Sequence, residues 1–201
     1  MAESRGFYTR MHKLLRERML DVTAEMICAE GWQAVTMTRV ADQVGVSRQS
    51  VYKEIGSKTA LGEAVVARET DRVLASVIDR LRAHGADATA GIPDAAGYVL
   101  RTSVDNPLIK AILLGAPGGD SDLLPLLAIR PEPVLGRAIA VVRTEARALY
   151  RDLLPVTAID LASEIVVRLT LSHLMQPTGP IDEPIAQSRL LVAAALGVTR
   201  R

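Results

Sequence analysis

Apolar residues recur along the chain with helical spacing. Between Thr9 and Glu30 they fall every three or four positions, which predicts a helix over 9–30 that stops at Gly31. The same spacing predicts further helices over about 94–104, 107–114, 132–154, 157–175 and 184–196. The segments "AHGADATAGIPDAAG", "GAPGGDSD" and "QPTGPIDEP" are predicted connections because Gly and Pro interrupt helices. No segment alternates like a strand, so the predicted fold is all-α, with about nine helices.

A brief glycine-containing break separates two short helical patterns. Thr36 is positioned to cap a helix that runs to Val44, and Gly45 supplies the left-handed conformation that ends it. Ser47 then caps a second helix over about 48–53. Two short helices joined in this way form a helix-turn-helix, whose second helix can enter a DNA major groove.

The apolar positions of this region predict which face remains outside. Four valines would fill the space between the two short helices and the helix over 9–30, namely Val40, Val44, Val46 and Val51. Arg48, Gln49 and Ser50 then face outward. Ser57 caps a fourth helix over about 58–82. We therefore expect a three-helix DNA-binding domain over 1–57 and a helical ligand-binding and dimerisation domain over 58–201.

Composition and charge exclude several classes of protein. The 201 residues carry a net charge of only +1, unlike a histone-like polycation. The single cysteine, Cys28, allows no internal disulfide and is expected to be buried. No run approaches the ~20 apolar residues that span a bilayer, and the first residues lack the apolar segment of a signal peptide. We expect a cytoplasmic protein without a membrane partner.

Candidate enzyme chemistry is missing from the sequence. Its three histidines, His12, His84 and His173, are scattered, and no HExxH, glycine-rich phosphate loop or G-x-S-x-G elbow is present. We expect no catalytic residue, no cofactor and no metal site.

The last two helical patterns bear on assembly. In "TAIDLASEIVVRLTLSHLM" the charged residues form one stripe of Asp160, Glu164 and Arg168, and nearly all other positions are apolar or small. The final pattern contains Ala193, Ala194 and Ala195, which permit close packing. A homodimer through these two helices explains both patterns. Burial of the same residues within one monomer is the alternative.

Residues 9–63 resemble the DNA-binding domain of TetR-family transcriptional regulators. The shared pattern is carried by Thr36, Val40-Ala41, Gly45-Val46-Ser47, Tyr52 and the run from Ser57 to Leu61. The resemblance covers the first third of the chain. It implies a homodimer that binds palindromic operator DNA, as a repressor released by a small ligand.

The resemblance also implies roles for individual residues. Arg48, Gln49 and Ser50 occupy positions that reach base edges, where Arg can bind guanine and Gln adenine. Tyr52 and Lys58 match positions that hold phosphates. The expected DNA-binding set is Thr36, Thr38, Arg48, Gln49, Ser50, Tyr52, Lys53 and Lys58.

One position departs from the family pattern. Where the family has a phosphate-contacting His, this chain has Glu54, which cannot hold a phosphate when ionised. Either Glu54 turns away and pairs with a base such as Lys53 or Arg39, which we prefer, or it selects a cytosine amino group. Glu54 also keeps open an alternative function, a helical dimeric protein-interaction module whose helix-turn-helix no longer reads DNA.

The helices after residue 83 are rich in Leu, Ile and Val and contain only two aromatic residues. An aliphatic lining favours a small apolar, fatty-acid-like effector. The candidate ligand-binding residues are Tyr98, Arg101, Leu113, Val142, Tyr150, Ile165, Leu169 and His173. For His173, an ordinary core or interface role is the stronger expectation.

Overall fold

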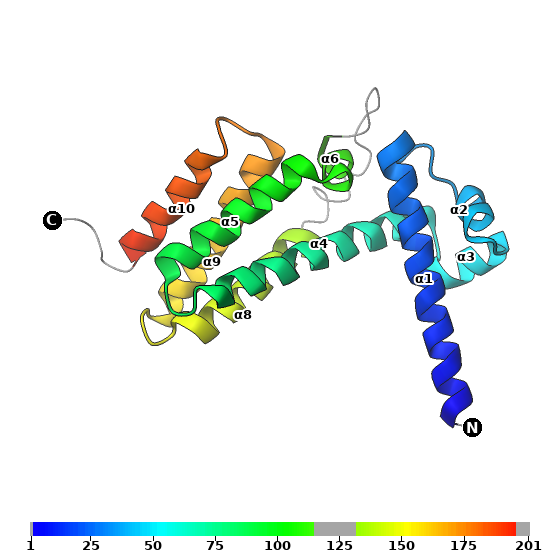
Figure 1. Cartoon of the computed structure of the whole chain (residues 1–201), viewed down its shortest axis with the longest axis horizontal. Helices are drawn as coiled ribbons and strands as arrows, with labels where there is room; N and C mark the ends of the chain where they lie inside the picture. The colour runs from blue at the N-terminus through cyan, green and yellow to red at the C-terminus, as the bar shows by residue number, and fades with distance from the viewer. Residues whose placement is uncertain (1, 115–131, 196–201) are drawn as a thin grey trace. The chain divides into compact units, whose positions relative to one another are not determined.

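The structure, a computed structural model, describes residues 2–114 and 132–195. Within these ranges it contains nine α-helices, one π-helical turn and no strand, which confirms the all-α prediction (Figure 1). The elements are α1 (Ala2–Glu30), α2 (Met37–Val44), α3 (Arg48–Ile55), α4 (Lys58–Ala83), α5 (Ala88–Asp105), α6 (Pro107–Leu114), η1 (Glu132–Gly136), α8 (Arg137–Tyr150), α9 (Val156–Met175) and α10 (Asp182–Ala195). The predicted connection "GAPGGDSD" at 115–122 lies outside the described residues.

The described helices divide into two compact units. The first contains α1, α2, α3, the part of α4 up to Arg68, and α6. The second contains α4 from Glu69 onward, α5, η1, α8, α9 and α10. Helix α4 therefore contributes residues to both units.

Local capping forms the short helices of the first unit as predicted. The Thr36 side chain accepts the backbone N–H of Arg39 at 3.2 Å, and that of Ser47 accepts the N–H of Ser50 at 3.1 Å. Gly45 ends α2 with φ of 79°, in the left-handed region that favours glycine. These contacts satisfy amides and carbonyls that a helix leaves unpaired at its ends.

Buried valines hold α2 and α3 against α1. Val40 and Val51 are fully buried, whereas Val44 and Val46 are half-buried. Fully burying a valine side chain contributes roughly 1.5–3 kcal/mol. This packing holds one face of each short helix and leaves the opposite face of α3 exposed.

Several predicted boundaries were wrong. Helix α1 begins at Ala2 rather than at residue 9. Helix α5 begins at Ala88 rather than at residue 94, because Asp87 caps it by accepting the N–H groups of Thr89 and Ala90, and the helix continues through Pro93. The predicted helix over 132–154 is divided into η1 and α8, and α8 ends at Tyr150. Cys28 is half-buried rather than buried.

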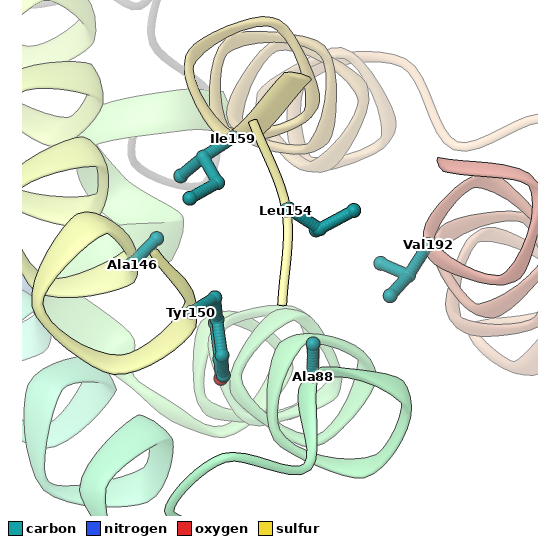
Figure 2. Close-up of a cluster of buried hydrophobic side chains, with 6 residues drawn as sticks. All are labelled: Ala88, Ala146, Tyr150, Leu154, Ile159 and Val192. Carbon is teal, nitrogen blue, oxygen red and sulfur yellow. The ribbon is translucent and has the colours of Figure 1, made fainter. Parts of the chain in front are cut away.

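Figure 2 shows an apolar cluster in the second unit, to which four helices and the α8–α9 connection contribute. Its members are Ala88, Ala146, Tyr150, Leu154, Ile159 and Val192. Small residues let α5 approach this cluster closely. A Cβ atom placed on Gly91 would lie 3.0 Å from the Tyr150 hydroxyl oxygen.

The described helices differ from helices that cross a bilayer. None combines the length and the apolar character that a membrane-spanning helix needs.

Candidate nucleic-acid interface

Helix α3 exposes a polar face. Arg48, Gln49, Tyr52 and Lys53 are exposed, while Val51 on the opposite side is fully buried. An eight-residue helix held by a buried valine presents these four side chains to solvent in a fixed register. Guanidinium, amide, phenol and ammonium groups are those that bind base edges and phosphates in DNA.

Arg48 and Tyr52 contact each other on this face. The Arg48 guanidinium lies 5.3 Å from the centre of the Tyr52 ring, and its Nη2 donates to the Tyr52 hydroxyl at 3.3 Å. Stacking restricts the rotamers of both side chains, so less entropy is lost when they meet DNA. The phenol also keeps a proton that it can donate to a phosphate.

Two of the predicted contact residues take part in helix capping. The Ser50 hydroxyl lies 2.8 Å from that of Ser47, and the Thr36 side chain caps α2. Thr38, one residue inside α2, is exposed. Among Thr36, Thr38 and Ser50, only Thr38 takes no part in these caps of α2 and α3.

Lys58, at the start of α4, is held beside Trp32. Its ammonium lies 4.8 Å from the centre of the Trp32 ring and donates to the backbone oxygen of Gln33 at 3.4 Å. These contacts fix a positive charge at a helix N-terminus, where the unpaired amides also favour an anion. The sequence interpretation did not identify Trp32, although it directly follows the glycine that ends α1.

Glu54 turns away from the exposed face of α3, toward α1. Its Oε2 lies 2.8 Å from Nδ1 of His12, and Arg16 donates to its backbone oxygen at 3.3 Å. The preferred interpretation of Glu54 was therefore right about its direction and wrong about its partner. Arg39, one suggested partner, instead pairs with Glu30 through two hydrogen bonds of 2.6 and 3.0 Å.

The Arg39–Glu30 contact has an electrostatic consequence. The hydrogen bond from Arg39 lowers the pKa of the Glu30 carboxyl. Glu30 ends α1 and Arg39 lies in α2, so the pair joins two helices of the same unit.

The eight predicted ligand-binding residues are distributed over both units. Tyr98 and Val142 pack around the same buried cluster, and Ile92 and Leu149 connect that cluster with the one that holds Tyr150. Leu113 belongs to the first unit. The remaining four, Arg101, Ile165, Leu169 and His173, are not members of either cluster.

Two of these four have contacts that explain their positions. Arg101 is exposed, and its Nη2 lies 3.8 Å from Asp94. The Nδ1 atom of His173 lies 3.0 Å from the backbone oxygen of Leu169, one turn earlier in α9. Ile165 is exposed on α9 and Leu169 is half-buried.

Tyr150 has an unusual environment among the eight. Its side chain is 1% exposed, and its hydroxyl has no hydrogen-bond partner within the described part of the chain. Burial raises the pKa of Tyr150 to about 12, and the charges of Asp87 and Glu145 add to the effect.

Helices α9 and α10 expose large apolar side chains. Leu161 is 62% exposed, Ile165 37% and Leu190 71%. The charged residues of α9 form ion pairs with α8 or with each other. Asp160 pairs with Arg147 of α8, and Glu164 pairs with Arg168 of α9 at 2.9 Å. The described part of the second unit therefore leaves these apolar side chains exposed.

Comparisons with known proteins cover nearly the whole chain. Residues 19–65 match the family described as bacterial regulatory proteins, tetR family. Residues 87–194 match the family described as bacterial tetracyclin repressor, C-terminal domain. The second match alone covers more than half of the chain.

Individual relatives agree with these matches. The HTH-type transcriptional regulator AlkX of Mycobacterium tuberculosis is 30% identical over 167 residues, which are 82% of this chain and 76% of the relative. The HTH-type transcriptional repressor KstR of the same organism is 32% identical over 101 residues, which are 50% of this chain and 46% of the relative. The solved TetR family repressor AlkX from Dietzia sp., implicated in biodegradation of n-alkanes, is 23% identical with a TM-score of 0.72 and covers 92% of this chain and 96% of its own.

Proposed function

The chain belongs to the TetR family of bacterial transcriptional regulators, and on that premise we propose that it binds palindromic operator DNA as a homodimer and acts as a repressor released by a small apolar effector. As a member of this family it is a regulator of transcription and not an enzyme. The alternative of a protein-interaction module is not favoured, because Glu54 faces His12 and so places no unpaired carboxylate on the exposed face of α3.

The exposed face of α3 is the observation that carries the proposal. Arg48 and Gln49 are exposed in its first turn, where a recognition helix contacts base edges. Tyr52, Lys53 and Lys58 supply hydrogen-bond donors for DNA phosphates around Arg48 and Gln49. In this arrangement base contacts specify the sequence and phosphate contacts position the protein.

The exposed apolar side chains of α9 and α10 support a dimer. Leu161, Ile165 and Leu190 are exposed, and a second copy would cover them with the same residues. Two recognition helices would then bind half-sites one turn of the double helix apart.

The proposed effector has an alkyl chain. The buried clusters of the second unit consist mainly of aliphatic side chains, and a solved structure with this fold is a repressor implicated in n-alkane biodegradation. Tyr98, Val142 and Tyr150 are the candidate residues that belong to, or pack against, these two clusters. Since α4 contributes to both units, we propose that effector binding is coupled to operator binding through α4; a hundredfold loss of affinity requires about 2.7 kcal/mol.

The test begins with selection of bound duplexes from a random pool. We expect a palindromic consensus, an affinity that falls steeply with salt through counterion release, and release of the DNA by hexadecanoic acid or n-hexadecane. Failure to select any sequence would refute the DNA-binding proposal. Selection without release by either compound would refute only the effector class.

A further inference from the structure

The first half of α1 is basic and extends past the helix-turn-helix. Residues 4–16, "SRGFYTRMHKLLR", contain four Lys or Arg residues and His12 but no Asp or Glu. Acidic residues resume at Glu17, so the charge is concentrated at one end of the helix. Figure 1 shows the blue N-terminal half of α1 continuing beyond α2 and α3.

This basic segment is joined to the C-terminal turn of α3. His12 contacts the Glu54 carboxylate and Arg16 donates to the Glu54 backbone oxygen, so α1 is fixed beside the recognition helix at this turn. The contact also pairs the one acidic group of α3 with an imidazole of the segment. A carboxylate that would repel phosphates is thereby turned toward a basic neighbour.

Two basic side chains of the segment, Arg10 and Lys13, are exposed. The Nε of Arg10 donates to the Gly6 backbone oxygen one turn earlier. His12 is 55% exposed despite its contact with Glu54. Arg10 and Lys13 therefore place two positive charges at the surface of the unit that holds α3.

We propose that Arg10 and Lys13 bind the phosphate backbone of the operator, as a second DNA-contacting element beside α3. The inference rests on the proposed operator binding and goes beyond it, because the phosphates lie outside the base pairs that α3 reads. Charge complementarity identifies DNA as the partner. The segment carries basic residues and no acidic ones, and it would lie near the phosphates of DNA bound by the recognition helix α3.

The apolar side of the same helix suggests a different occupant. Phe7, Met11 and Leu14 are each at least 50% exposed, and a basic amphipathic helix also suits an anionic membrane surface. We favour DNA because His12 and Arg16 tie the segment to the last turn of α3, the helix whose exposed face suits DNA.

The test compares the double variant Arg10→Ala/Lys13→Ala with the wild type on the selected operator. Each phosphate contact contributes about 0.9 to the slope of log affinity against log salt, so losing two contacts in each of two subunits should reduce the slope by about 3.6. Base preference should not change, and hydroxyl-radical footprints should lose protection only at phosphates outside the bases read by α3. The control Lys110→Ala/Arg151→Ala removes the same charge from exposed positions on α6 and after α8, and should leave the slope unchanged.

Three outcomes overturn the inference. An unchanged slope and footprint in the double variant would show that the segment does not contact DNA. Loss of binding to phosphatidylcholine–phosphatidylglycerol vesicles without any change in operator binding would assign the segment to membranes. If the wild type selects no operator, the proposed function fails and this inference fails with it, whereas the first two outcomes leave the proposed function intact.

Discussion

Replacing Tyr150 with phenylalanine should stabilise the protein at neutral pH. The side chain is 1% exposed, and its hydroxyl has no hydrogen-bond partner within the described residues. Burying a hydroxyl without a partner costs about 1–3 kcal/mol, and phenylalanine keeps the ring that packs against the cluster of Figure 2. We expect the free energy of unfolding to rise by about 1 kcal/mol in the Tyr150→Phe variant.

The same substitution should matter more at alkaline pH. Burial raises the pKa of Tyr150 to about 12, against about 10 for a tyrosine in the unfolded chain. Between these values the unfolded state releases the proton and the folded state keeps it, so stability falls by roughly 1.4 kcal/mol per pH unit. The variant lacks this loss. Its advantage over the wild type should therefore grow from about 1 kcal/mol at pH 8 to roughly 2.4 kcal/mol at pH 11.

Urea unfolding followed by circular dichroism at fixed protein concentration measures both quantities. A double-mutant cycle with Gly91→Ala supplies the structural control, because the added methyl group would lie 3.0 Å from the Tyr150 hydroxyl oxygen. The cost of Gly91→Ala should be smaller in the Tyr150→Phe background. A variant less stable than the wild type at pH 8, or an advantage that does not grow with pH, would show that the hydroxyl is hydrogen-bonded and the reasoning wrong.

Three further predictions address the first unit and the assembly. Ser47→Ala should lower the free energy of unfolding by about 1 kcal/mol in the same urea assay, because α3 loses its N-cap; an unchanged value would mean that the cap does not stabilise the fold. Arg48→Ala should relax base preference at one operator position, with a loss of about 1–3 kcal/mol in binding free energy. Lys58→Ala should instead weaken binding to all sequences alike. Indistinguishable selection profiles for the two variants would contradict these roles. Leu190→Glu should convert the dimer to a monomer in light-scattering measurements, because the carboxylate would be buried against a second copy; a persistent dimer would exclude this face.

The helix-turn-helix could be predicted because its determinants are local. Thr36 and Ser47 cap helices whose amides lie three residues away, and Gly45 adopts a backbone conformation set by its own lack of a side chain. The valines that pack α2 and α3 against α1 could be identified from spacing alone. Such features depend on residues close in sequence, so one sequence suffices to find them.

Other elements depended on contacts between distant residues. Helix α5 was predicted to begin six residues too late, because Gly91 and Pro93 appeared unsuitable for a helix. In the structure both are buried and packed, and Asp87 caps the first turn. Likewise, Glu54 pairs with His12, a residue 42 positions earlier. Packing and pairing across that distance are not encoded in any local pattern.

The sequence by itself determined the helical class and the exposed face of α3, because periodicity and capping act within a few residues, whereas the candidate DNA contacts on that face came from the resemblance to the TetR family. Tertiary structure alone decided which candidate ligand residues meet, that Tyr150 carries a buried hydroxyl, and that α1 joins its basic half to the end of α3. Those outcomes depend on how helices far apart in the chain pack together. Hydrophobic burial drives such packing without direction, and only the folded chain defines which side chains it brings into contact.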